Sequence, residues 1–215
     1  KKEFAEKFDS RSNLHSTVLE EFISYLFNDM VREVSEAALF GKAHSFKDIF
    51  FLPGNFADMV KNPSVRIEQK DHDFVIGVKI DTTMTCEGEE RGENYIIQVP
   101  AVAIECKTYL DKTMLEGSST AASQLKAKNP NALYIVVSEW LKLTESVNLN
   151  KYQVDQVYVL RKQKNTDREY RFSPDYVKNP IYSDVVMHLF NYVRNHLTVD
   201  WVNGISHGLE KGYLL

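Results

Sequence analysis

Two charged residues, Glu105 and Lys107, interrupt an otherwise apolar stretch, "PAVAIECKTYLDK" at residues 100–112. The run "AVAI" before them is typical of a central strand that is buried on both faces. Side chains alternate along a strand, so Glu105 and Lys107 project to the same side while Cys106 points into the packed face. Burying charge without purpose costs several kcal/mol. We therefore interpret the two charges as a functional site; an ion pair on an edge strand is the alternative.

An aspartate one strand earlier completes a candidate metal site. Asp73 opens the segment "DFVIGVKID", and antiparallel pairing of this strand with residues 99–107 would bring Asp73 close to Glu105 and Lys107. Two carboxylates and the backbone carbonyl of Cys106 are hard oxygen ligands suited to Mg²⁺, for which Mn²⁺ could substitute. Such a metal polarises a phosphate and acidifies a bound water, and a neighbouring lysine steadies the developing charge. The set therefore predicts phosphodiester hydrolysis.

Two residues close to Asp73, Asp71 and His72, are further candidates for a role in the site. Asp71 would share a strand face with Asp73, so parity alone does not exclude it as the metal ligand, although we favour Asp73. His72 lies between them and could serve as a proton shuttle. Strand alternation points its ring away from both aspartates, which favours a structural role. Cys106 is interpreted as a small core residue rather than a nucleophile.

The rest of the chain supplies the elements that must hold this site. Residues 16–41 have helical spacing of apolar residues, with Thr17 and Glu20 at capping-box spacing and Gly41 as the stop, and residues 42–64 resemble an irregular connector. Further along we expect strands at 65–70, 73–81 and 95–110, a helix at 111–128, strands at 131–141 and 155–163, and a helix at 182–197. This order predicts an α/β fold with a mixed central sheet flanked by helices.

The candidate site residues resemble a known nuclease pattern. Asp73 followed by "Glu105-Cys106-Lys107" is similar to the PD-(D/E)xK nuclease signature, although no proline precedes Asp73. The sequence more closely resembles the BbvCI-like type II restriction endonucleases over roughly residues 8–165. The segments that carry the resemblance are "FDSR" (8–11), "LEEFISYLF" (19–27), "KDHDFVIG" (70–77), "PAVAIECKTYLDKTML" (100–115) and "VYVLRKQ" (157–163).

The resemblance implies a restriction-endonuclease-like core and a role for each site residue. Asp73 and Glu105 would ligate the metal, and Lys107 would be the catalytic lysine. Glu20 would be the acid that members of this superfamily often supply from the first helix. The alternative for Glu20 is that it closes the capping box with Thr17.

The resemblance also implies an activity and partners. The expected reaction is Mg²⁺-dependent cleavage of double-stranded DNA at a short specific sequence, leaving 5′-phosphate and 3′-hydroxyl ends. A second subunit, identical or different, would cut the other strand. One alternative is a repair or structure-specific nuclease on the same fold. The other is a catalytically silent DNA-binding subunit, against which the intact acidic and basic set argues.

Basic residues outside the motif are candidates for DNA contacts. The stretch "LRKQKNTDREYR" at residues 160–171 is the densest basic segment, and Arg and Lys side chains contact phosphates and base edges. A solvated loop or helix face is the alternative. The candidates are Lys112, Lys126, Arg161, Lys162, Lys164 and Arg168.

Length and composition limit the classes of protein to which the chain can belong. The chain has 215 residues, a formal net charge of −4 and two cysteines, which is too few for a disulfide framework or a zinc site. No apolar run is long enough to span a membrane, so we expect no membrane contact. With two cysteines and no visible signal peptide, a reducing, cytoplasmic setting is the default expectation. We expect one endonuclease domain over residues 1–215, with a catalytic core at about 14–165 and a helical part at about 175–215. Because the chain begins without Met, we also expect a preceding N-terminal segment to be missing.

Overall fold

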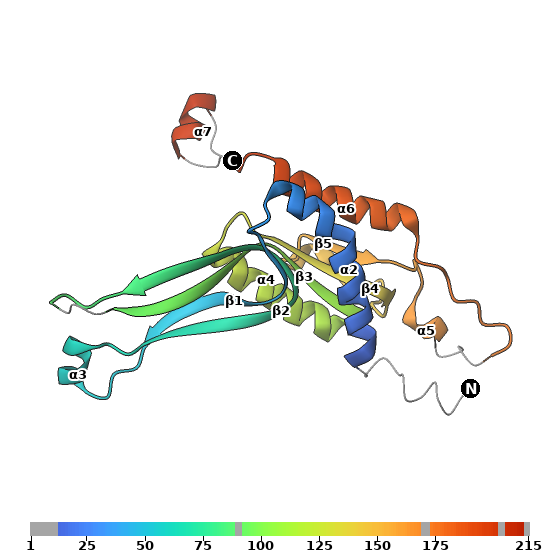
Figure 1. Cartoon of the computed structure of the whole chain (residues 1–215). Helices are drawn as coiled ribbons and strands as arrows, with labels where there is room; N and C mark the ends of the chain where they lie inside the picture. The colour runs from blue at the N-terminus through green and yellow to red at the C-terminus, as the bar shows by residue number, and fades with distance from the viewer. Residues whose placement is uncertain (1–12, 89–91, 169–172, 202–204, 213–215) are drawn as a thin grey trace.

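Five strands form one sheet in the computed structural model, which describes residues 13–88, 92–168, 173–201 and 205–212 (Figure 1). The sheet is mixed, because the first three strands pair antiparallel and the last three pair parallel. The order across the sheet follows the chain: β1 (Leu39–Phe51), β2 (Val65–Met84), β3 (Glu93–Leu110), β4 (Leu133–Leu141) and β5 (Gln156–Val159). The expectation of a mixed sheet flanked by helices is confirmed.

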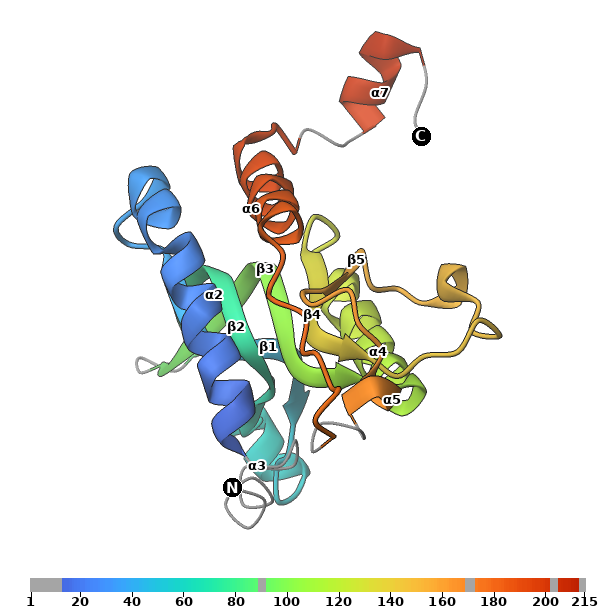
Figure 2. The same cartoon turned by 90° about the vertical axis from the view of Figure 1, so that its right-hand side faces the viewer.

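Helices cover both faces of this sheet. One face carries α2 (Asn13–Val34) and α6 (Ser183–Thr198), and the other carries α4 (Lys112–Lys128), as the end-on view shows (Figure 2). Four shorter helices of the described segments lie outside these layers: α3 (Phe56–Lys61), η1 (Leu149–Lys151), α5 (Asn165–Arg168) and α7 (Ile205–Lys211). No helix of the described residues is long and apolar enough to cross a membrane.

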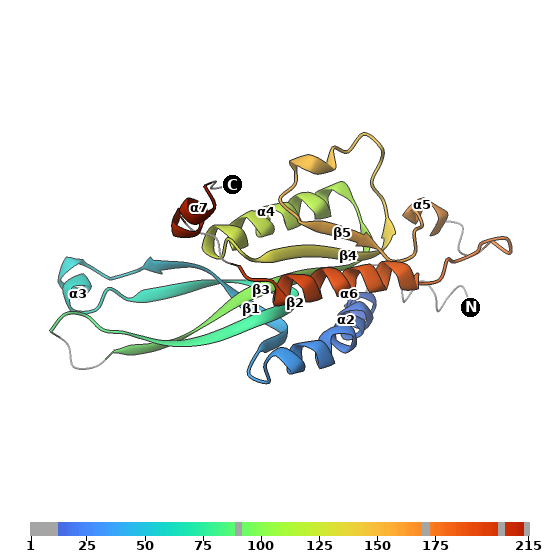
Figure 3. The ribbon, with the colours of Figure 1, turned by 90° about the horizontal axis from the view of Figure 1, so that it is seen from above.

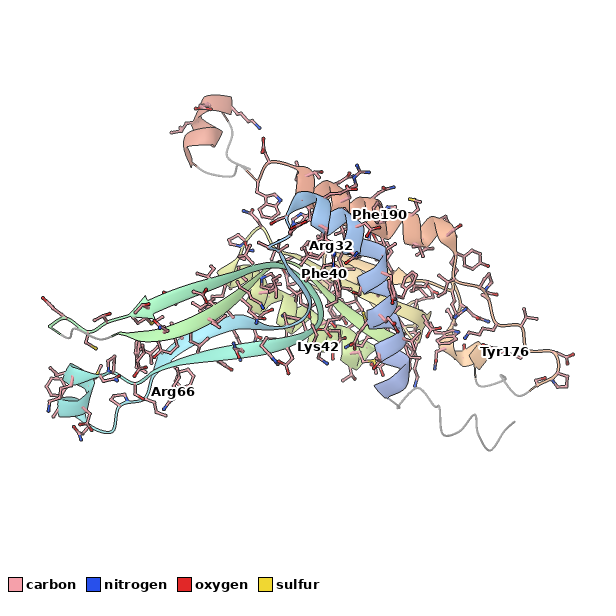
Figure 4. All side chains as sticks on the ribbon, in the orientation of Figure 1. Arg32, Phe40, Lys42, Arg66, Tyr176 and Phe190 are labelled. Atoms are coloured by element: carbon pink, nitrogen blue, oxygen red, sulfur yellow. The ribbon has the colours of Figure 1, made fainter. Side chains whose placement is uncertain are left out.

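Strand alternation divides the core into two sides. Ile104 and Cys106 of β3 are buried toward α2 and α6, whereas Ala103 is buried toward α4. Aromatic rings join the helices to the sheet on the first side. Phe27 of α2 stacks on Phe190 of α6 at 6.0 Å, and Figure 4 marks Phe190 on this face. Alternation along β3 therefore places Glu105 and Lys107 on the α4 side, opposite Cys106. The sequence predicted that the two charged residues share one side.

The connection from β3 to β4 fixes the end of the strand that carries the site. Asp111 caps α4, and its side chain accepts the backbone N–H of Met114 at 2.9 Å. The helix then returns the chain so that β4 runs parallel to β3, with Glu105 beside Val136. Such β-α-β units need a helical crossover, and the 111–128 helix expected from the sequence is confirmed.

Residues 42–64 are not the irregular connector that the sequence predicted. The first helix ends at Val34 instead of Gly41, and residues 39–51 form β1, followed by α3 at 56–61. The segments 65–70 and 73–81 belong to one strand, β2. Together β1, β2 and β3 extend beyond the helices as a long arm with α3 near its end (Figure 3). Pairing with β2 decides this structure, because "LFGKAHSFKDIFF" has too many polar residues to show a clear strand pattern.

The capping box expected at the start of the first helix is also wrong. Helix α2 begins at Asn13, so Thr17 and Glu20 both lie inside it. Their spacing therefore reflects one turn of helix and not an N-terminal cap. This removes the structural alternative that was considered for Glu20.

Candidate active site

The site forms where the pairing of β2 with β3 stops. The ladder of backbone hydrogen bonds ends at the pair Phe74 and Ile104. Beyond this pair, the Asp73 carboxylate takes the place of a backbone carbonyl of β2 as the acceptor for β3. Asp73 Oδ2 accepts the backbone N–H of Cys106 at 2.8 Å. Because the N–H and C=O of one strand residue point toward the same neighbour, the Cys106 carbonyl also faces this gap. The end of the ladder thus gathers carboxylate and carbonyl oxygens at one place.

Lys107 joins the two carboxylates. Its Nζ donates to Asp73 Oδ2 at 3.1 Å and to Glu105 Oε2 at 2.7 Å. The three side chains are partly accessible, with exposed fractions of 24% for Asp73, 12% for Glu105 and 27% for Lys107. The cluster predicted from the sequence is therefore present in the fold and partly exposed to solvent.

Burial and charge set the protonation states of this cluster. Burial alone would raise the pKa of Glu105, but the hydrogen bond from His72 and the charge of Lys107 outweigh it and lower the pKa to about 2. Burial acts to lower the pKa of Lys107, and the charges of Glu105 and Asp73 more than reverse this and raise it. Glu105 and Lys107 are thus both charged at neutral pH. Burial raises the pKa of the Cys106 thiol, which agrees with a core residue rather than a nucleophile.

His72 does not point away from the site, contrary to the sequence expectation. Gly41 pairs with Val75 and Ala43 pairs with His72, so β2 carries one extra residue between these two pairs. Such a β-bulge shifts the alternation of side chains. The His72 ring consequently reaches Glu105, with 3.3 Å between Nδ1 and Oε1, and it is only 2% exposed.

Tyr134 at the second position of β4 is a site residue that the sequence reasoning missed. Its hydroxyl donates to Glu105 Oε1 at 3.0 Å from a fully buried ring. Burial, followed by the charge of Glu105, raises the pKa of this phenol, which keeps it a proton donor. The only hint in the sequence was a tyrosine within the buried run "NALYIVVSEWL", since a buried hydroxyl needs a partner.

Glu20 lies at the edge of the cluster, on α2. Burial and then repulsion from Asp73 raise the pKa of Glu20, whereas the charges of Lys42 and Lys107 oppose the increase. Lys42, labelled on β1 close to α2 in Figure 4, is exposed and was not singled out from the sequence. The fold therefore places a third carboxylate, Glu20, within electrostatic range of Asp73, and a second lysine, Lys42, within range of Glu20.

Asp71 lies apart from this cluster. Its exposed side chain pairs with His44 of β1. The bulge that turns His72 inward also removes Asp71 from the face that it was expected to share with Asp73. Between the two aspartates, the structure brings Asp73 to Lys107.

Comparison with known proteins identifies the family. The family model described as Bpu10I restriction endonuclease matches residues 11–214. The chain belongs to the Bpu10I restriction endonuclease family. The match continues through the C-terminal residues, in which the sequence motifs showed little resemblance. Among proteins with curated descriptions, none matches the chain significantly.

A solved structure confirms the fold of this Bpu10I family member. The structure described as "native BbvCI A2B2 tetramer at low resolution" superimposes with a TM-score of 0.64 and 20% sequence identity. The match covers 77% of this chain and 61% of the BbvCI chain, so our chain spans less than two thirds of that protein's length. The resemblance to BbvCI-like enzymes drawn from the sequence is confirmed at the level of the fold, and the family model confirms a restriction endonuclease family.

The oxygen donors of this family member fit a hard divalent ion. Among the described residues, no group of three or more His, Cys, Asp and Glu side chains is arranged to hold a metal. Asp73 and Glu105 nevertheless converge on the same ammonium group. The Cys106 N–H bonds to Asp73, so the carbonyl of the same strand residue faces the same gap. Mg²⁺ commonly takes one or two carboxylates and keeps several waters, so this small donor set suits it.

Three of the six candidate DNA contacts are on the surface. Lys112 lies 3.8 Å from Glu116, Lys164 lies 3.4 Å from Glu145, and Lys162 pairs with Asp184. These lysines are 62%, 53% and 47% exposed, respectively, so their weak pairs leave them accessible to a phosphate.

The other candidates differ in their surroundings. Lys126 donates to Asp155 and to the Gln153 carbonyl. Arg161 is held by Glu139 and by the Asn179 carbonyl and is only 13% exposed. A DNA contact by either residue would require these bonds to break. Arg168 ends α5, and its side chain lies outside the described residues.

Proposed function

We propose that this chain is a type II restriction endonuclease, or one subunit of one, that hydrolyses phosphodiester bonds in double-stranded DNA with Mg²⁺. The observation that carries the proposal is the convergence of Asp73, Glu105 and Lys107 at the end of the β2–β3 ladder, in a chain of a restriction endonuclease family. A metal bound to Asp73, Glu105 and the Cys106 carbonyl would polarise the phosphate and acidify a water; Mn²⁺ could replace Mg²⁺.

Each side chain then has a distinct role. Lys107 holds its proton and places positive charge beside the phosphate oxygens, where negative charge develops. Asp73 and Glu105 fix the Lys107 ammonium group through its two hydrogen bonds. Glu20 adds a carboxylate from α2 on the side of Asp73. In-line attack by water with departure of the 3′-oxygen would leave 5′-phosphate and 3′-hydroxyl ends.

We propose that the enzyme works with a second, different subunit. The A2B2 composition of the BbvCI neighbour supports an assembly of two kinds of chain. A single active site cuts one strand of a duplex, so a second site is needed for a double-strand break. The neighbour's composition favours a heteromeric partner over a second copy of this chain.

Cleavage of supercoiled plasmids containing varied sequences tests the proposal. Full-length protein with Mg²⁺ is incubated beside Lys107→Ala and a control, Lys79→Ala, which changes an exposed lysine of β2 outside the site. We expect cleavage at discrete positions by the wild type and the control, and a loss of at least about 100-fold in Lys107→Ala because charge stabilisation of the transition state is removed.

The products separate the alternatives. Nicked circles from this chain alone, converted to linear fragments when a partner chain is added, would support the heteromeric assembly. Degradation without discrete bands would favour a repair or structure-specific nuclease. DNA binding without cleavage by any variant would contradict the enzyme and favour a silent subunit.

A further inference from the structure

The two oxygens of the Glu105 carboxylate have different partners. Oε2 accepts from Lys107 at 2.7 Å, on the open side of the site. Oε1 faces inward, where the Tyr134 hydroxyl donates at 3.0 Å and His72 Nδ1 lies at 3.3 Å. A carboxylate with two inward partners cannot rotate without losing both hydrogen bonds. The orientation of the outward oxygen therefore depends on the two buried rings.

The two rings are themselves held rigidly. His72 is 2% exposed, Tyr134 is fully buried, and the rings meet edge to face at 5.6 Å. Tyr134 also packs in the α4-side core with Val75 and Ala103. Groups locked by packing hold a functional side chain more accurately than loop residues do. Residues on β2 and β4 thus support a carboxylate on the strand between them.

We infer that His72 and Tyr134 are positioning residues that orient Glu105 for metal binding and for its contact with Lys107. The inference rests on the proposed function and extends it to two residues that do not touch the substrate. Partners behind a metal-binding carboxylate typically change metal affinity or activity by about 10- to 100-fold. A purely structural role would instead leave both unchanged in protein that remains folded.

Tyr134→Phe is the sharpest test because it removes one hydroxyl and keeps the ring. We expect kcat to fall about 10- to 100-fold while DNA affinity without metal stays within about 2-fold. We expect Mn²⁺ binding to the DNA-free protein, measured by calorimetry, to weaken by a similar factor. Tyr158→Phe on β5 is the matched control, since this buried tyrosine packs on the α2 and α6 side of the sheet and its hydroxyl lies 2.9 Å from His188, away from Glu105. Thermal unfolding of each variant checks the fold.

Two variants of His72 complement this test. Asn at position 72 keeps a donor near the place of Nδ1, whereas Leu removes it. We expect His72→Asn to retain most of the Mn²⁺ affinity and kcat, and His72→Leu to lose them about 10-fold or more. Equal loss in both variants would contradict a role of the Nδ1 donor.

The outcomes distinguish failure of this inference from failure of the proposed function. Wild-type kcat and Mn²⁺ affinity in Tyr134→Phe, beside an active wild type, would overturn the positioning role alone. A fall in activity that only follows the loss of folded protein would do the same. Wild-type protein that neither binds Mn²⁺ nor cleaves DNA would overturn the proposed function and the positioning role with it.

Discussion

At the scale of single residues, Glu105 links the chemistry of the site to its stability. The pKa of this carboxyl is about 2 in the folded protein against an ordinary value of 4.5, because the hydrogen bond from His72 and the charge of Lys107 outweigh the effect of burial. A depressed pKa stabilises the folded state above the unfolded pKa, and the contribution is lost as pH falls through the folded pKa. The stabilisation is therefore present at pH 7 and disappears between about pH 5 and pH 2.

This linkage predicts the pH dependence of Glu105→Gln. We expect the variant to be less stable than the wild type at pH 7 by up to roughly 3 kcal/mol, and the difference to shrink toward pH 2. Urea unfolding across this pH range measures it. Glu116→Gln, half exposed on α4, is the control and should stay within about 0.5 kcal/mol of the wild type. A gap that is constant with pH would contradict the assigned pKa.

At the scale of elements, β2 depends on a glycine where β3 approaches it most closely. At Gly77 the register between β2 and β3 shifts by one residue. A Cβ at this position would lie 2.2 Å from the Val99 carbonyl oxygen and 2.9 Å from Pro100 Cα. Because both contacts are with backbone, no side-chain rotation relieves them. The close approach therefore sets the pairing that carries Asp73 toward β3.

Gly77→Ala should consequently destabilise the protein by about 2 kcal/mol or more, since the strands must separate. Gly117→Ala in α4 is the matched control, because a Cβ there meets nothing within 4 Å. An exposed helical glycine replaced by alanine should stabilise the protein by about 0.5–1 kcal/mol. Thermal or urea unfolding compares the two, and a neutral Gly77→Ala would show that the strands can separate without loss.

At the scale of the whole molecule, Arg161 joins the C-terminal segment to the sheet. Its Nε donates to Glu139 Oε2 at 2.8 Å, and Nη1 donates to the Asn179 carbonyl. The Asn179 side chain returns a hydrogen bond to the Arg161 carbonyl at 3.1 Å. The guanidinium also lies over Trp140, 5.2 Å from the ring centre. These contacts anchor the chain that leads to α6.

Arg161→Ala should therefore destabilise the fold by about 2–4 kcal/mol, because it removes the hydrogen-bonded partner of the mostly buried Glu139 carboxylate and leaves, among the described residues, only Lys178, 4.0 Å away. DNA affinity per folded molecule should be unchanged. Lys164→Ala removes an exposed pair and should change stability by no more than about 1 kcal/mol. Unfolding curves and DNA binding at several salt concentrations measure both effects. A weaker salt dependence in folded Arg161→Ala would instead support the DNA contact expected from the sequence.

The sequence alone indicated the charged residues of the candidate site, Asp73, Glu105 and Lys107, and the general fold. Glu105 and Lys107 were recognisable because charge is costly in a buried strand, and the "AVAI" run before them marked that strand. The helix at 112–128 was also recognisable, since Ala121, Ala122 and Leu125 fall on one side at helical spacing. Patterns of this kind depend on residues that are close in the chain, so they can be recognised without the tertiary structure.

Tertiary structure alone decided which groups support the site. The bulge in β2 turns His72 toward Glu105 and takes Asp71 away, and it arises from the register between β1 and β2 rather than from a local signal. Tyr134 reaches Glu105 only because β4 lies parallel to β3. Strand β1 itself was missed, because its polar residues gain their structure from pairing with β2. Strand registers depend on contacts between distant segments, so the surroundings of Glu105 could not be deduced from sequence periodicity.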